Sequence, residues 1–314
     1  MAFETLKSLL SSKNSVEQND EALTPSFRAL MNMKHDVPYL KDFNFKKTAI
    51  QSGDAKSAFK GRGIEFEEVR PYQFGDDVRD IDWRVTARKN QPYTKLYMEE
   101  KDREIYVWLD LSAHMYFGTK HELKSVTAAK TAALLGWLSL SYKDRFGMAL
   151  YTGSQTYIFE PQRQQEYFLS ILKKTENVAR ENLSSLAKQE TIQKSLQLLQ
   201  KKVNRNAVVF LVGSFYPNDS TILKQISNIS SSNEVYVVDI YDKLEGIAPP
   251  RGEYSAEYEG VKETIKNYDE KYEIAYEAYF ENKRNIIKNF CTKYRVHYRS
   301  IRTDLPIYQQ LRPV

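Results

Sequence analysis

Short apolar runs alternate along this chain with stretches in which apolar residues recur every three or four positions. The runs predict buried β-strands, because a strand covered on both faces is apolar throughout. They lie at 105–109, 145–151, 207–212 and 234–240. Helical spacing lies at 120–142, 162–174, 183–202, 219–229 and 269–294. Strands that alternate with helices in this way predict an α/β protein with a mainly parallel sheet flanked by helices.

Other patterns divide the chain into parts. Residues 155–159 follow a turn at Gly153 and predict a hairpin partner for 145–151, and residues 296–301 and 305–311 predict a last strand and a closing turn of helix. We expect an N-terminal arm over 1–50, where no clear period is present. A β-containing charged extension is expected over 51–103, with strands near Ile64–Val69 and Tyr93–Met98. The α/β domain is expected over 104–314, with a β-hairpin near 253–266.

Composition narrows the class of protein only slightly. The net charge of +5 permits an anionic partner but does not require one. Cys291 is the only cysteine, so no internal disulfide forms, which is typical of a reducing compartment. No apolar run approaches the roughly 20 residues that span a bilayer, and residues 131–140 predict a buried helix instead. With no signal-peptide pattern at the N-terminus, we expect a cytoplasmic protein that does not span a membrane.

Charges of both signs are dense between Gly53 and Arg88. Each carboxylate has an arginine nearby, which favours an ion-pair network or a protein-docking surface over catalysis. Ile81 and Trp83 lie between the charges and are expected to anchor the segment to a core. In an interface, arginine and tryptophan are the residue types expected as anchors. We therefore assign partner binding to Arg70, Asp76, Asp77, Arg79, Asp80, Asp82, Trp83, Arg84 and Arg88.

The order of motifs over residues 50–311 resembles that of a known bacterial family. The run GRGIEFEEVRPYQFGDDVRDIDWRVTARKNQPYTKLYMEE, followed by VWLDLSAHM, is similar to the family named domain of unknown function fifty-eight. A strand with an Asp-x-x-Glu…Pro loop in VYVVDIYDKLEGIAPPRG, and Thr303-Asp304 near the end, extend the resemblance. The resemblance implies a von Willebrand A-like (Rossmann-like) domain. It also implies a MoxR-type AAA+ ATPase as partner, because members are commonly encoded beside such ATPases.

A carboxylate and a hydroxyl follow the strand 105–109, where both can point at one ligand. The resemblance implies that this loop is a DxSxS loop, which holds a Mg²⁺-like ion in von Willebrand A-type domains. Here it reads Asp110-x-Ser112-x-His114, and Gly213-Ser214 stands where a Ser-Asp pair is expected. The resemblance therefore implies a degenerate metal-ion-dependent adhesion site at Asp110, Ser112 and Ser214, for which Mg²⁺ is the candidate cofactor. The alternative is that Asp110 and Ser112 hydrogen-bond their own loop and cap a helix beginning near Lys120.

Motifs for nucleophilic catalysis and nucleotide hydrolysis do not occur in the sequence. No GxSxG elbow and no GxxxxGK[ST] loop is present. Cys291 lies in a helical pattern beside Phe290 and is expected to be buried and inert. His114 with one aspartate is a weak set for a softer metal. We therefore expect no enzymatic activity.

Three functions follow from these patterns. The first is a non-enzymatic interaction module, an adaptor or co-chaperone of a MoxR-type AAA+ ATPase and its protein clients in complex maturation or stress tolerance. Its binding face would combine segment 61–88 with the sheet edge at 110–115, including His114. The alternative is a metal-dependent hydrolase or nuclease that uses Asp76, Asp77, Asp80, Asp82 and Asp110. The third is nucleic-acid binding through the basic stretch 283–302, but a solvated helix face explains that stretch and no nucleic acid is expected.

Overall fold

Two compact units make up the chain. The computed structural model describes residues 21–40, 64–99, 103–183, 191–215, 220–258 and 261–312. One unit comprises Met1–Lys47 with Arg103–Val314, and the other is Thr48–Asp102. The smaller unit begins and ends close to the limits expected for the charged extension. Residues 1–20 and 41–50 of the expected arm, and residues 61–63 of the expected binding segment, lie outside the described ranges.

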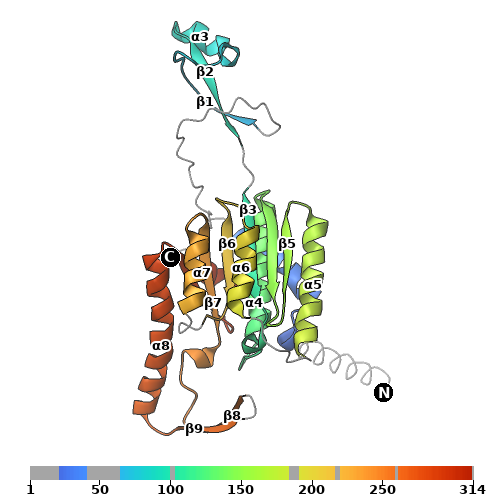
Figure 1. Ribbon diagram of the computed structural model, residues 1–314, viewed down its shortest axis with the longest axis vertical. Coiled ribbons are helices and arrows are strands. Elements are labelled where there is room, and N and C mark those ends of the chain that lie inside the picture. Colours follow the sequence, from blue (N-terminus) through green and yellow to red (C-terminus); the bar gives the residue numbers. More distant parts are fainter. Residues whose placement is uncertain are drawn as a thin grey trace, which may run out of the picture. The chain divides into compact units, whose positions relative to one another are not determined.

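A six-stranded sheet forms the centre of the larger unit (Figure 1). The strand order is β10-β7-β6-β3-β4-β5, in which the first five strands are parallel and β5 runs antiparallel to β4. The strands are β3 (Glu104–Asp110), β4 (Arg145–Tyr151), β5 (Thr156–Gln162), β6 (Val208–Gly213), β7 (Glu234–Tyr241) and β10 (His297–Arg302). The predicted mainly parallel sheet and the predicted β5 hairpin are confirmed.

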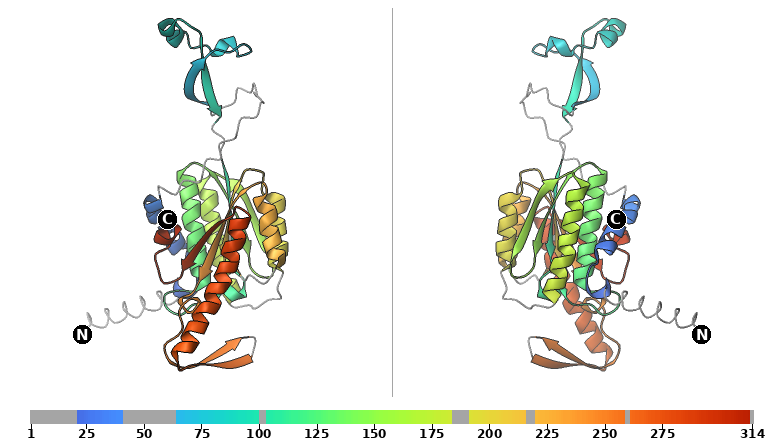
Figure 2. Two further views of the ribbon diagram at one scale, coloured as in Figure 1. Left: turned by 90° about the vertical axis from the view of Figure 1, so that its left-hand side faces the viewer. Right: turned by 90° about the vertical axis from the view of Figure 1, so that its right-hand side faces the viewer.

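Helices cover both faces of this sheet (Figure 2). Because side chains alternate along a strand, β3 places Val107 in one apolar core and Trp108 in the other. The first core packs against α4 (Lys124–Ser141), α5 (Gln165–Leu183) and the short α9 (Ile307–Leu311). The second packs against α6 (Ile192–Lys202), α7 (Ser220–Ser230) and α8 (Glu270–Lys293). Within the described ranges, no helix is long and apolar enough to cross a membrane.

The described part of the expected N-terminal arm belongs to the first core. Residues 21–40 include α2 (Phe27–Asn32) and the 3-10 helix η1 (Met33–Leu40). Leu30 and Leu40 are buried there, and the indole Nε1 of Trp137 in α4 donates to the Leu30 carbonyl at 3.1 Å. The expectation of an arm is wrong for this stretch, because elements this short bury apolar residues without showing a helical period.

Two predicted helix limits shift. The helix expected to end at residue 174 continues to Leu183, because Val178 and Ala179 extend its buried face. The helix expected from residue 183 begins at Ile192, where the Thr191 side chain caps it by accepting from Lys194 N–H at 3.4 Å. Residues 184–190, which lie between the two helices, are outside the described ranges.

Antiparallel hairpins complete the two units. In the smaller unit, β1 (Ile64–Pro71) pairs with β2 (Tyr93–Glu99), as the two predicted strands required. The connection between them carries η2 (Val78–Asp80) and α3 (Trp83–Lys89). In the larger unit, β8 (Gly252–Tyr258) pairs with β9 (Val261–Asn267), which confirms the hairpin predicted near 253–266.

Candidate functional site

The carboxyl ends of β3 and β6 mark the point where the direction of strand order reverses. From β3 the chain adds β4 on one side, and it later returns to add β6 on the other side. Helix α4 follows β3 on one face and α7 follows β6 on the other, so the two loops diverge. Ligands of open α/β sheets bind at such points. Here the structure brings together what we call the carboxyl-edge cluster: Asp110, Ser112, His114, Lys124, Ser214 and Glu245.

Asp110 is 1 % exposed and has partners for both carboxylate oxygens. Its Oδ1 accepts from Ser112 N–H at 2.8 Å and from Ser112 Oγ at 2.6 Å. Its Oδ2 lies 3.1 Å from Nε2 of His114. The expectation that Asp110 and Ser112 hydrogen-bond their own loop is confirmed. The expected capping role is wrong, because α4 begins at Lys124 and its N-cap residue Leu123 offers no side-chain hydrogen bond.

The ring of His114 faces acceptors on both sides. Nε2 lies 3.1 Å from Asp110 Oδ2 and 3.2 Å from the Ser214 carbonyl oxygen, and neither atom can donate. Nδ1 lies 3.0 Å from Ser112 Oγ, whose own hydrogen points to Asp110. These contacts favour the protonated ring, in which both nitrogens donate. Burial alone would lower the pKa of His114, but the adjacent Asp110 carboxylate and the hydrogen bond to the Ser214 carbonyl together outweigh burial, and the pKa is raised.

Lys124 is the residue that the sequence interpretation missed. Its side chain is 1 % exposed, and Nζ donates to Glu245 Oε1 at 2.8 Å and to Ser214 Oγ at 3.3 Å. Glu245 ends the 3-10 helix η4 (Lys243–Glu245), which follows β7, and its other oxygen accepts from Asp242 N–H at 2.8 Å. Lys124 therefore ties the start of α4 to the loops after β6 and β7. The Asp-x-x-Glu motif was the one sequence signal that pointed to this loop.

Asp242 joins the remaining family motifs at the same edge. Its Oδ1 accepts from Thr119 Oγ1 at 2.6 Å, and its Oδ2 accepts from Thr119 N–H at 3.0 Å and from Thr303 Oγ1 at 3.1 Å. Burial alone would raise the pKa of Asp242, but these donors, together with Leu244 N–H at 2.9 Å, hold it below its usual range. The Asp-x-x-Glu loop and the terminal Thr303 therefore belong to one buried hydrogen-bond network.

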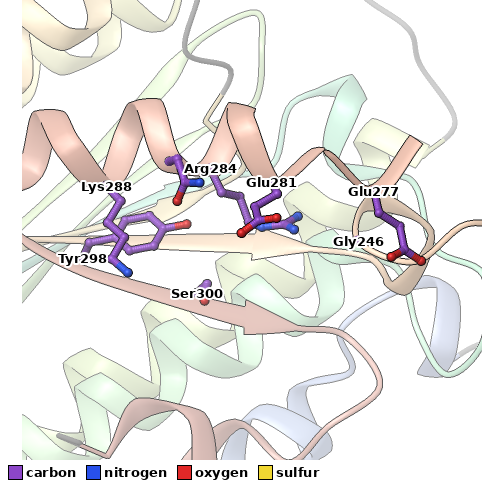
Figure 3. Close-up of a pocket in the computed structure, with 8 residues that line it drawn as sticks. Gly246, Glu277, Glu281, Arg284, Lys288, Tyr298 and Ser300 are labelled. Atoms are coloured by element: carbon purple, nitrogen blue, oxygen red, sulfur yellow. The ribbon is translucent and has the colours of Figure 1, made fainter. Parts of the chain in front are cut away.

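A second buried carboxylate connects this edge to a hollow on the surface. Asp239 of β7 accepts from Phe215 N–H at 3.2 Å and from the Tyr298 hydroxyl at 3.0 Å, and burial raises its pKa to about 6. Tyr298 lines a hollow of about 300 Å³ beside α8 (Figure 3). Its other lining residues are Gly246, Glu277, Glu281, Arg284, Asn285, Lys288 and Ser300. With two acidic and two basic side chains, the hollow does not favour a ligand of one charge.

The three expected metal ligands do not present a free set of oxygens. Mg²⁺ takes near-octahedral oxygen ligands at about 2.1 Å, usually including one or two carboxylates. Both oxygens of Asp110 already accept, Ser112 Oγ donates to one of them, and Ser214 Oγ accepts from the Lys124 ammonium. In the part of the chain that the structure describes, no group of three or more His, Cys, Asp or Glu could hold a metal ion. The residues therefore do not fit a divalent ion.

Gly213 lets the end of β6 approach Asp110. A Cβ atom at this position would lie 2.8 Å from Asp110 Cβ and 3.3 Å from its Oδ2. Gly213→Ala is expected to lower the free energy of unfolding by about 1–3 kcal/mol, because the close-packed neighbour must move. Urea unfolding measures this change.

Gly246→Ala is the matched control for Gly213→Ala. Its Cβ would meet no atom closer than 3.4 Å, which is ordinary contact. We expect this control to change stability by about 0.5 kcal/mol or less. Equal losses in the two variants would contradict the proposed close approach.

In the smaller unit, carboxylates of the charged extension stabilise the local structure. Asp76 is buried and pairs with Arg70 at 2.8 Å. Asp77 caps η2 by accepting from Arg79 N–H, and Asp82 caps α3 by accepting from two backbone N–H groups. The hydrolase alternative would use four carboxylates of this segment, and three of them already have these structural roles. The fourth, Asp80, is half-buried in η2.

Residues 72–92, which we call the exposed connection, present large apolar and basic side chains to solvent. Trp83 is 68 % exposed, and Phe74 and Val78 are also exposed. The expectation that Trp83 anchors the segment is therefore wrong; it is the first residue of α3, whose half-buried side chains are Val85 and Thr86. Ile81 is half-buried and bridges to Thr94. The exposed basic residues of this connection are Arg79, Arg84, Arg88 and Lys89.

Solved structures with some likeness to this chain come from other bacteria. The conserved hypothetical protein BatB from Bacteroides thetaiotaomicron is 14% identical, with a TM-score of 0.43 and coverage of 66% of this chain and 93% of that chain. An aerotolerance-related membrane protein from Bacteroides fragilis is 12% identical, with a TM-score of 0.37 and coverage of 60% and 99%.

Related sequences give the family. The uncharacterized proteins Rv1480 of Mycobacterium tuberculosis and Mb1516 of Mycobacterium bovis are each 34% identical over 109 residues, or 35% of this chain. The match spans about a third of the length of these relatives, 34%. The family described as "Protein of unknown function DUF58" matches residues 68–285, which is more than half of the chain. The chain therefore belongs to this family of proteins of unknown function, DUF58.

Proposed function

We propose that this protein is a non-enzymatic interaction module that serves a MoxR-type AAA+ ATPase as an adaptor or co-chaperone. The role would lie in protein-complex maturation or stress tolerance, in the cytoplasm. The family resemblance suggests the ATPase as partner. The observation that carries the proposal is the exposure of Trp83 beside arginines in the exposed connection. Tryptophan and arginine are among the commonest anchors of protein interfaces.

The larger unit is, in this proposal, a von Willebrand A-like domain. Its five parallel strands carry one antiparallel edge strand, and helices cover both faces. The Asp110-x-Ser112 loop follows the first strand of this sheet, at the point where strand order reverses. These features support the assignment that the resemblance implies.

The partner surface that fits the exposed connection is acidic and has an apolar recess. Arg79, Arg84 and Arg88 would supply positive charge around the indole of Trp83. Arginine suits such a surface because its planar fork binds carboxylates through two parallel hydrogen bonds. An ATPase domain with clustered aspartate and glutamate on its outer face meets this requirement.

Reversing two of these charges tests the proposal. The double variant R79E/R84E is expected to weaken binding to the purified AAA+ ATPase at least about tenfold, because like charges would face each other across the interface. Arg79 and Arg84 are exposed, and Asp77 and Asp82 cap their helices through backbone N–H groups that the substitutions leave in place. Biolayer interferometry with ATP and with ADP measures the dissociation constants.

The matched control reverses two exposed lysines of the larger unit. K201E/K224E makes the same change in net charge on α6 and α7, outside the exposed connection. This variant is expected to bind like the wild type, and both variants should keep the wild-type circular dichroism spectrum. Wild-type affinity in R79E/R84E would contradict the assignment of the interface.

A further inference from the structure

Lys124 lies at a position where both the helix dipole and burial are unfavourable for a positive charge. It is the first residue of α4, where the helix dipole favours negative rather than positive charge. Its side chain is 1 % exposed, and a buried ammonium is costly unless it is paired. Neither helix propensity nor solvation therefore explains a lysine here. Its contacts with Glu245 and Ser214 do.

We propose that the Lys124 ammonium is the resident cation of the carboxyl-edge cluster, and that this site takes no divalent metal. In an oxygen-lined site, a dication would balance the buried carboxylates. Here the Glu245 carboxylate is balanced by Lys124 Nζ at 2.8 Å. Asp110 is held by its own loop and by the His114 ring. The charge that a metal would supply is thus already present in the chain.

The Lys124 ammonium lies close enough to the expected metal position to repel a bound dication. Lys124 Nζ lies 3.3 Å from Ser214 Oγ, which is one of the three expected metal ligands. An ion bound to Ser214 Oγ at about 2.1 Å would lie no more than about 5.4 Å from the ammonium. At that separation two positive charges in a buried site repel strongly, because little water screens them. Binding of a dication would therefore require Lys124 to leave Glu245.

The ammonium of Lys124 also fixes the structure of this edge of the sheet. Lys124 closes the point of strand reversal by bonding to the loops after β6 and β7. A partner that touches this edge would meet a preformed, charge-balanced surface and not a metal with a free coordination position. This inference does not depend on the proposed ATPase partner.

A manganese titration of the purified full-length protein tests the inference. Mn²⁺ is the probe, since it prefers the same oxygen ligands as Mg²⁺ and its binding is seen by electron paramagnetic resonance. We expect no saturable binding up to about 1 mM, and no change in Tm on adding Mg²⁺ or EDTA. Saturable binding with a Kd below about 1 mM, lost in Asp110→Asn, would overturn the inference.

Two reconstructed variants separate the role of Lys124 from that of the missing oxygens. H114S/S214D restores an Asp-Ser-Ser-Asp set and keeps Lys124, whereas H114S/S214D/K124S also removes the ammonium. Mn²⁺ is expected to bind the second variant at least about tenfold more tightly than the first. Equal binding would contradict the role of the ammonium. Circular dichroism checks the folding of both variants, and if either fails to fold, the wild-type titration with Asp110→Asn still decides the question.

Discussion

Replacing Lys124 by methionine is expected to lower the free energy of unfolding by about 3–5 kcal/mol, because removing one partner of a buried ion pair leaves the other charge uncompensated. Methionine has a similar volume and keeps the apolar contacts of the stem. The loss would therefore come from the Glu245 carboxylate, whose side chain is mostly buried and bonds Lys124 Nζ at 2.8 Å. Urea unfolding at neutral pH, followed by circular dichroism, measures it.

A double variant is the control for this prediction. In K124M/E245Q the pair is neutral, and glutamine retains an oxygen that can accept from Asp242 N–H, as Glu245 does at 2.8 Å. We expect the double variant to recover at least about half of the loss, since replacing both partners of a buried pair is often nearly neutral. A loss below about 1 kcal/mol in Lys124→Met would contradict a structural role for the ammonium, because exposed pairs contribute that little.

Replacing Asp239 by asparagine is expected to remove a pH-dependent loss of stability. Burial raises the pKa of Asp239 from 3.8 to about 6. Since the folded state holds this proton more tightly than the unfolded state, the contribution of Asp239 to stability is highest below pH 3.8 and falls as pH rises to about 6. The difference in pKa corresponds to about 3 kcal/mol by pH 7. Asparagine cannot ionise, so the stability of Asp239→Asn relative to wild type should rise by that amount from acid to neutral pH.

Tyr298→Phe is the matched variant, and it is expected to increase the pH-dependent loss of stability that Asp239→Asn removes. The Tyr298 hydroxyl donates to Asp239 at 3.0 Å and stabilises the ionised carboxylate. Without this donor, stability should fall more steeply with pH than in wild type. Urea midpoints between acid and neutral pH provide the comparison. Parallel pH profiles for wild type, Asp239→Asn and Tyr298→Phe would show that Asp239 does not titrate in this range.

Most of the sheet is predictable from the sequence because its strands are buried on both faces. β6 and β7 are short, nearly continuous apolar runs, a pattern that predicts a buried strand because most helices are longer. The stretch 21–40 is different. α2 has only six residues, which is too short to show a helical period. η1 is a 3-10 helix interrupted by Pro38, so its apolar residues do not recur at α-helical spacing. Their place in the core depends on the surface of α4, which local pattern does not encode.

The candidate site is only partly predictable for a similar reason. Asp110, Ser112 and Ser214 follow apolar strands, and parallel strands bring such residues to one edge. Lys124 follows no such rule, since a lysine at the start of a helix pattern is usually solvated. Its partner Glu245 lies 121 residues away, and only the folded chain brings the two together. Trp83 shows the opposite error, in which the sequence predicts a buried residue that is exposed. A large apolar side chain among charges suggests a core anchor, but Trp83 faces solvent.

Affinity purification of the tagged full-length protein from its native bacterium, with and without ATP, tests the proposed function most directly. Mass spectrometry of the retained proteins should identify an AAA+ ATPase whose recovery depends on ATP, and R79E/R84E should lose it while K201E/K224E retains it. Absence of any AAA+ ATPase in both nucleotide states, from a tagged protein that is folded and recovered in good yield, would contradict the adaptor role.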